Sequence, residues 1–430
     1  MAGAGRAGAG GAGARLAREA VARLRAETPG VPAAGSGAGG LAHLNNAGAA
    51  LPPSCVLAAQ VDFLREEAAR GGYEAAERAE AAGALRRPYV ALARLLGCAP
   101  EEVAVVQSAT AAWQQVFYGL DLGPNDDVLF SEAEYGSNFI AALQCRKRRG
   151  CRIRVVPNDS RGQLDVSALD EMLGEPMRGG GRRVVAVTHI PTSSGTVNPA
   201  PEIGKVCARY GAPFLLDACQ TVGQLAMDVR AWGVTWATGT GRKYLRAPRG
   251  CGFLYASPEG MELAEPGFLD NWGAEWTAMD DYTLNPTARR YESYEMSVAA
   301  KLGLGVAAEY ALAVGPEAAE ERIVGLAEDL RAQLQELKGV QVHDRGPRLC
   351  GIVSFTKEGC GAQGLKESLA RAGVNVTVSR RPSTRADFER RGLEEVVRAS
   401  VHYFNTEDEL RRLVDAVAEA PPAPPRNPGR

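Results

Sequence analysis

Two side chains of complementary chemistry stand in one stretch near the middle of the chain. Asp217 ends a short apolar run, and Lys243 follows a glycine-containing turn. A lysine amine can form a Schiff base with a carbonyl cofactor, and a carboxylate can keep the pyridine nitrogen of that cofactor protonated. The turn Thr240–Arg242 can bind a phosphate through backbone N–H groups and a guanidinium. Pyridoxal phosphate (PLP) requires all three features, although a lysine beside arginines is also typical of a solvated basic face or a nucleic-acid contact.

A longer pattern surrounds these residues. It reads Asp-Ala-Cys-Gln-Thr-Val-Gly from Asp217, then Thr-Gly-Arg-Lys up to Lys243, then Gly-Cys-Gly-Phe-Leu-Tyr. This pattern resembles the class V aminotransferase family of PLP enzymes, which includes cysteine desulfurases and isopenicillin N epimerase. The family has Ser-Gly-x-Lys, so Thr240 and Arg242 replace its usual serine and histidine, and both can still bind phosphate. The resemblance implies that Lys243 is the catalytic lysine and that Gln220 hydrogen-bonds the phenolic oxygen of the cofactor.

The composition is that of an ordinary globular protein. The 430 residues are 45% hydrophobic and 23% charged, and the net charge is −2, so no strong field favours nucleic acid. No apolar run approaches the roughly 20 residues that cross a bilayer. We therefore expect neither nucleic acid nor a membrane as a partner. The resemblance implies a small-molecule amino-acid substrate and a homodimer.

Cysteine and histidine usage points to a reducing compartment. Nine cysteines are scattered without a Cys-x-x-Cys pair, and there are four histidines. This pattern predicts neither a metal site nor a disulfide framework. A cytoplasmic protein fits best, while the absence of acids before Glu19 leaves organellar targeting as an alternative.

Apolar runs of strand length alternate with helix-length segments from residue 103 onwards. This alternation predicts an α/β domain with a mostly parallel sheet covered by helices on both faces. The resemblance implies fold type I of the PLP-dependent transferases. The strand-length runs lie at 103–106, 128–130, 153–156, 184–187 and 214–216, and the helical segments at 109–120, 135–149, 165–173 and 200–210.

We expect four parts along the chain. Residues 1–40, rich in Ala and Gly, form a disordered or loosely helical tail, and the Pro-rich residues 421–430 form a second disordered tail. Residues 41–282 form a large cofactor-binding domain. Residues 283–420 form a small C-terminal α/β domain that begins with a long helical stretch, 295–337.

Ligands of parallel sheets bind beyond the carboxyl ends of the strands, and candidate residues stand there. Ala109 and Thr110 open a helix after the run 103–106, where free N–H groups favour phosphate. In the family two threonines occupy these places. Tyr135 stands where the family has an aromatic residue or histidine over the cofactor ring, and Thr192 where an asparagine contacts cofactor or substrate. The alternatives are a plain helix N-cap and a tyrosine packed at a helix start.

Two further residues resemble substrate-binding positions. Asn46 lies in Asn-Asn-Ala-Gly, similar to the family's opening segment near the substrate, and is otherwise an ordinary polar turn. Arg398 lies in Arg-Ala-Ser-Val-His-Tyr-Phe-Asn-Thr, which resembles the family segment whose arginine binds the substrate α-carboxylate. Its planar fork suits bidentate recognition of a carboxylate. The alternative is a strand-edge arginine in an ion pair.

The loop before Arg398 bears on the reaction. Cysteine desulfurases carry their persulfide-forming cysteine there, and residues 379–396 contain none. We therefore favour C–S β-elimination from a cysteine derivative or its S-oxide. An isopenicillin N epimerase-like epimerase, a transaminase and, as the weakest alternative, a cofactor-free binding protein remain open. The aromatic-rich region 272–294 resembles the family segment that crosses a dimer interface, or else packs as a surface loop.

Overall fold

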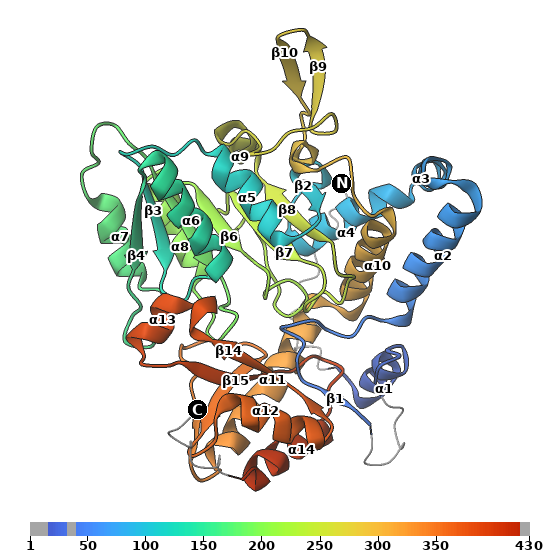
Figure 1. Cartoon of the computed structure of the whole chain (residues 1–430), viewed down its shortest axis with the longest axis vertical. Helices are drawn as coiled ribbons and strands as arrows, with labels where there is room; N and C mark the ends of the chain where they lie inside the picture. Colours follow the sequence, from blue (N-terminus) through green and yellow to red (C-terminus); the bar gives the residue numbers. More distant parts are fainter. Residues whose placement is uncertain (1–15, 32–39, 422–430) are drawn as a thin grey trace, which may run out of the picture.

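A seven-stranded sheet forms the centre of the computed structural model, which describes residues 16–31 and 40–421 (Figure 1). The strand order is β2-β8-β7-β6-β5-β3-β4. All neighbouring strands are parallel except β8, which is antiparallel to β2 and β7. The predicted mostly parallel sheet is confirmed. The strands are β2 (Val103–Val106), β3 (Asp127–Ser131), β4 (Arg152–Val156), β5 (Arg183–Thr188), β6 (Phe214–Asp217), β7 (Trp236–Thr240) and β8 (Gly252–Ala256).

Both faces of this sheet are covered, which explains the continuous apolar runs of its strands. Val103 and Val105 of β2 pack into one core, whereas Ala104 and Val106 pack into another on the opposite face. Two helices contribute to the second core, α5 (Ala109–Gly119) and α6 (Gly136–Arg149). The first core takes side chains from α4 (Arg87–Leu96), α7 (Val166–Gly174), α8 (Ala200–Arg209) and α10 (Val298–Val314).

A smaller sheet and its helices occupy the lower part of Figure 1. The strand order is β11-β12-β15-β14, and every neighbouring pair is antiparallel. A third core lies between this sheet and three helices. The elements are β11 (Val340–Val342), β12 (Ile352–Lys357), β14 (Thr377–Arg380), β15 (Glu395–Ser400), α11 (Pro316–Gln335), α12 (Ala362–Arg371) and α14 (Glu407–Glu419).

The chain passes from the first core to the third at Gly315. Side chains of α10 pack with the large sheet, and those of α11 pack with the small one. Gly315 has φ 91, a conformation that favours glycine, and Pro316 then opens α11. The predicted helical stretch 295–337 is therefore two helices, and the predicted boundary after residue 282 precedes this change of core. No single described helix is long and apolar enough to span a bilayer, and only α10 and α11 taken together pass that test, at a bend of 79°.

The N-terminal segment is attached to the small domain. Residues Arg18–Ala26 form helix α1, and its Leu24 is buried in the third core. Strand β1 (Ala42–His43) pairs with β13 (Val374–Asn375) in parallel. The described part of the predicted tail 1–40 is thus a packed helix. The tail predictions for 1–15, 32–39 and 422–430 lie outside the described residues.

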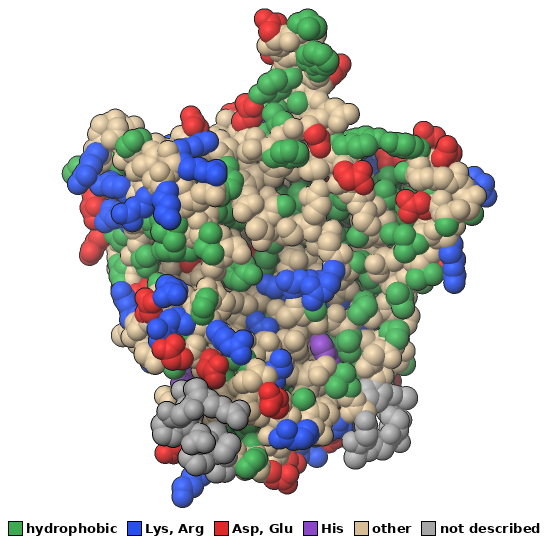
Figure 2. All heavy atoms as spheres, in the orientation of Figure 1, with side chains coloured by type: hydrophobic (Ala, Val, Ile, Leu, Met, Phe, Trp, Pro, Cys, Tyr) green, Lys and Arg blue, Asp and Glu red, His purple; other side chains and the backbone are tan. Residues whose placement is uncertain are grey.

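A β-hairpin projects from the large domain at the top of Figure 1, where the sequence predicted a loop region. It consists of β9 (Ala274–Ala278) and β10 (Asp281–Leu284). Hydrophobic and acidic side chains cover it in Figure 2. Trp276 is 73% exposed and Met279 is 87% exposed.

Candidate active site

One cavity gathers most of the predicted site residues at the carboxyl ends of β5, β6 and β7. Its volume is about 130 Å³. The start of α5 closes one side, and the turn after β7 closes another. All eight predicted cofactor residues line it together with Thr192, namely Ala109, Thr110, Tyr135, Asp217, Gln220, Thr240, Arg242 and Lys243.

Lys243 is held in a tight turn between β7 and β8. The Gly241 amide donates to the Cys251 carbonyl at 3.0 Å, which keeps the turn close to the following strand. Gly223 allows the chain after Lys243 to approach, because a Cβ there would lie 2.3 Å from the Tyr244 oxygen. Burial lowers the pKa of Lys243, so more of its amine is neutral and nucleophilic.

An aromatic ring faces this amine across the cavity. Lys243 Nζ lies 6.0 Å from the centroid of the Tyr135 ring. The Tyr135 amide donates to Thr188 Oγ1 at 3.3 Å and to Glu134 Oε1 at 3.1 Å, so the ring is anchored through its backbone at the start of α6.

The carboxylate of Asp217 is held by two donors at the end of β6. Asn138 Nδ2 donates to Oδ2 at 3.0 Å, and the Cys219 amide donates to Oδ1 at 2.9 Å. The same Asn138 nitrogen donates to Glu134 Oε1 at 2.9 Å. Burial raises the pKa of Glu134 to about 7. Glu134 is therefore a second buried carboxyl group beside the cavity, in contact with the lining residues Asn138 and Thr188, and the sequence did not single it out.

Part of the cavity wall is positively charged. Arg242 and Arg249 both line it, and neither has a carboxylate within 4.0 Å among the described residues. Burial and then the neighbouring Arg249 lower the pKa of Arg242, so an anion placed here would be stabilised. Ser108 caps α5 by accepting from the Ala111 amide at 3.1 Å, and the helix start faces the same space.

Arg398 lies beside the cavity without a counter-ion. Its Nη1 donates to the Thr192 carbonyl at 2.7 Å and to Thr192 Oγ1 at 2.9 Å, and its Nη2 donates to Asn45 Oδ1 at 3.2 Å. It is 5% exposed, and burial lowers its pKa to about 10. No described carboxylate lies within 4.0 Å, in contrast to the alternative of an ion pair. Such a guanidinium is suited to an incoming carboxylate.

Asn46 lies apart from the cavity. Its amide donates to the Ser400 carbonyl at 2.8 Å, and it is fully buried between the N-terminal segment and β15. Its neighbour Asn45 is the residue that contacts Arg398.

A comparison with protein-family models identifies the family of this chain. The model described as aminotransferase class-V matches residues 42–413. The chain belongs to this family. Class-V aminotransferases are PLP-dependent enzymes, and the fold is accordingly fold type I, as predicted.

Two similar class-V relatives carry desulfurase names. A probable cysteine desulfurase of Methanothermobacter thermautotrophicus is 28% identical over 88% of this chain and 94% of its own length. A probable cysteine desulfurase of Mycobacterium leprae is 29% identical over 92% of this chain and 96% of its own.

Solved structures show the same fold. The cysteine desulfurase CsdA from Escherichia coli has a TM-score of 0.82 at 20% identity, covering 93% of this chain and 98% of its own. The cystine C–S lyase C-DES, in complex with cysteine persulfide, has a TM-score of 0.79 at 22% identity, covering 89% and 98%.

The class-V cofactor fits the residues present. Asp217 offers a carboxylate for the pyridine nitrogen, Lys243 offers the amine, and the end with Arg242 and Arg249 offers charge to a phosphate. Gln220 Oε1 is a buried acceptor without a hydrogen-bond partner, and a bound ligand could donate a hydrogen bond to it. Gln220 Nε2 donates to the Ala47 carbonyl at 3.1 Å and, at 3.4 Å, to Thr192 Oγ1.

Eight of the lining residues were not predicted as site residues from the sequence. Asn138 stands one helical turn after Glu134, and both follow the end of β3, so polar residues after a strand were the available signal. The remaining unpredicted lining residues are Gln107, Ser108, Thr188, Ile190, Cys219, Arg249 and Gly250.

Proposed function

We propose that this class-V enzyme is a C–S β-lyase that acts on a cysteine derivative or its S-oxide. The observation that carries the proposal is the absence of a suitable cysteine nucleophile. Residues 379–396 contain no cysteine. Among the described residues that line the cavity the only cysteine is Cys219, and burial raises the pKa of its thiol. A persulfide-forming group must be a thiolate, so cleavage without a cysteine nucleophile is favoured.

The loop that lacks the cysteine lies next to the site. It contains the short helix α13 (Arg385–Arg390), and a Cβ at Gly136 would lie 2.8 Å from the Pro382 carbonyl oxygen. Gly136 follows Tyr135 directly, so this loop rests on the wall of the cavity. Since cysteine desulfurases carry their persulfide-forming cysteine in this loop, its absence here supports the proposal.

Each site residue has a separate role in the proposed elimination. PLP, when bound, supplies an electron sink for the charge that develops on the substrate α-carbon. Arg398 holds the substrate carboxylate, and Asp217 keeps the ring nitrogen protonated. Lys243 accepts the α-proton, and the sulfur group leaves the β-carbon with the bonding electron pair. Addition of water to the remaining three-carbon unit gives pyruvate and ammonium.

Proton NMR in heavy water tests this proposal. PLP-loaded enzyme is incubated with L-cysteine, L-cystine and an S-substituted cysteine sulfoxide. We expect pyruvate from at least one of them. Deuterium at the α-carbon without pyruvate would contradict β-elimination and support an isopenicillin N epimerase-like reaction, in which the proton returns to the opposite face.

A further inference from the structure

The loop Pro191–Thr196 touches the cavity with one end and the small domain with the other. Thr192 lines the cavity, whereas Gly195 lies against β12 and the turn before it. The Gly195 carbonyl accepts from the Cys350 amide at 2.8 Å, and Thr196 Oγ1 donates to the Arg345 carbonyl at 2.6 Å. The loop follows strand β5 of the large sheet in the sequence, but its hydrogen bonds attach it to the small domain.

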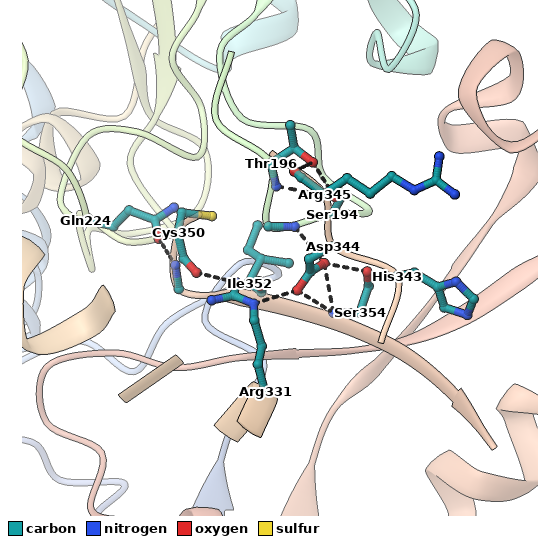
Figure 3. A network of polar contacts seen from close by, with 12 residues as sticks. Ser194, Thr196, Gln224, Arg331, His343, Asp344, Arg345, Cys350, Ile352 and Ser354 are labelled. Carbon is teal, nitrogen blue, oxygen red and sulfur yellow. Dashed lines mark hydrogen bonds and ion pairs between the residues drawn. The ribbon is translucent and has the colours of Figure 1, made fainter. Parts of the chain in front are cut away.

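A buried ion pair lies under this loop. Arg331 of α11 and Asp344 face each other in Figure 3, with Nε 2.9 Å from Oδ2. Their side chains are 6% and 0% exposed. Arg331 Nη2 also donates to the carbonyls of Cys350 and Ile352, at 2.6 and 2.5 Å. A buried pair with these additional partners holds one fixed geometry.

Asp344 connects that pair to the loop and to the strand beside Arg398. Its Oδ1 accepts from the Gly195 amide at 2.9 Å and from Ser354 Oγ at 2.6 Å. Ser354 is the residue of β12 paired with Arg398 of β15. The Asp344 carboxylate thus holds both the loop that carries Thr192 and the strand β12 that pairs with Arg398. These two segments meet at the hydrogen bonds between Arg398 and Thr192.

The close approach leaves no room for a side chain at Gly195. A Cβ there would lie 2.3 Å from the Ile352 oxygen, 2.4 Å from Arg331 Nη2 and 3.1 Å from Asp344 Cγ. These distances are far below ordinary contact, and the nearest atoms are backbone and a buried guanidinium. Alanine at this position must lift the loop away from the ion pair.

We propose that the Arg331–Asp344 pair positions the substrate-carboxylate subsite: by holding Gly195, it sets where Thr192 orients Arg398. Asp344 and Arg331 are positioning residues, since they act through the loop. The inference rests on the proposed function in one respect, the role of Arg398 as the carboxylate-binding group.

Binding of L-alanine to the PLP-loaded enzyme tests the inference. L-alanine has no β-leaving group, so it binds without elimination, and its dissociation constant follows from calorimetry and from the visible spectrum. We expect Asp344→Asn and Gly195→Ala each to weaken binding about tenfold, since a displacement of about 1 Å at a positioned group has effects of this order or larger. The spectrum without L-alanine should stay close to that of wild type, because no hydrogen bond joins the loop or the ion pair to Asp217, Arg242 or Lys243 among the described residues.

Two further variants make the result specific. Asp127→Asn removes a fully buried carboxylate at the start of β3, away from the carboxyl ends of the strands, which pairs with Arg152 at 2.6 Å, and it should bind L-alanine as wild type does. Arg398→Gln should weaken binding at least as much as Asp344→Asn. If Asp344→Asn fails to fold, Gly195→Ala still tests whether the position of the loop controls L-alanine binding, with both charged side chains present.

The outcomes separate the inference from the proposed function. Wild-type affinity in Asp344→Asn and Gly195→Ala, with weak binding in Arg398→Gln, overturns the inference alone. Equal weakening by Asp127→Asn also overturns it, because the effect would then be general destabilisation. Wild-type affinity in Arg398→Gln, or no binding by the wild type, contradicts the amino-acid site proposed above.

Discussion

At the scale of single residues, the proposed chemistry depends on the amine of Lys243. Burial lowers its pKa, and it faces Tyr135 across the cavity that Asp217 also lines. We expect Lys243→Ala to keep the fold and to lower turnover by about 10³-fold or more, because both the attachment point and the general base are lost. Borohydride treatment of PLP-loaded protein followed by mass spectrometry should label Lys243 in wild type and in the exposed-lysine control Lys205→Ala. Undiminished turnover in Lys243→Ala would remove this residue from its role.

The second residue-scale prediction concerns Glu134. Burial raises its pKa from 4.5 to about 7, so the folded state holds this proton more tightly than the unfolded chain. Its contribution to the free energy of unfolding is therefore complete below about pH 4.5 and is lost as the pH rises through about 7, and it amounts to about 3 kcal/mol. Glu134→Gln should flatten the pH dependence of urea unfolding of the apoprotein over this window. The exposed-residue control Glu77→Gln should leave it unchanged, and an unaltered pH dependence in Glu134→Gln would disprove the assignment.

The same residues show what the sequence reveals at this scale. Asp217 and Lys243 were predicted from a local pattern, at the end of an apolar run and after a turn, whereas Gln220 came from the resemblance. Arg398 was predicted through its resemblance, and its unpaired burial was not. Glu134 could not be predicted, because its burial depends on Thr188, whose amide donates to Glu134 Oε2 at 2.9 Å from the neighbouring parallel strand.

At the scale of elements, buried strands were predicted, whereas the exposed hairpin and the packing of helix α1 were not. Runs such as Val103–Val106 are fully buried on both faces, so their composition alone marks them. The hairpin β9–β10 has mostly exposed residues and no apolar run. Helix α1 is polar on most of its surface, and only the small-domain core determines that it packs.

Leu24 tests whether α1 is an integral element. It is 2% exposed and packs in the core of the small domain. Leu24→Ala should lower the free energy of unfolding by about 2–4 kcal/mol, since it removes buried methyl groups and leaves a cavity. Chemical denaturation measures this change. Leu57→Ala, at a site 47% exposed on α2 (Ser54–Arg70), is the control and should change it by less than about 0.5 kcal/mol. Equal, small effects would mean that α1 is loosely attached.

At the scale of the whole molecule, two domains with separate cores share one site. The large sheet supplies Asp217 and Lys243, and the small sheet supplies Arg398 from β15. The loop 191–196 lines the cavity at Thr192 and is held by the small domain at Gly195, so it links the cavity to the small domain. The resemblance could predict the participants, but the bridging contacts depend on packing at Gly195 that no local pattern encodes.

The projecting hairpin exposes large apolar side chains that a second copy of the chain could cover. Large apolar side chains exposed on a protruding hairpin are unfavourable in water and mark association surfaces. Trp276 and Met279 are 73% and 87% exposed on the hairpin, which extends away from the body (Figures 1 and 2). We propose that they contact a partner subunit in a homodimer, in agreement with the resemblance of this region to the family's dimer segment.

The double variant Trp276→Ser/Met279→Ser should raise the dimer dissociation constant about tenfold or more in sedimentation equilibrium, since buried aromatic residues dominate interface energies. Leu64→Ser, at a site 52% exposed on α2, is the control and should leave the dimer intact. A wild-type monomer at micromolar concentration, or an unchanged dimer in the double variant, would exclude the hairpin as the interface.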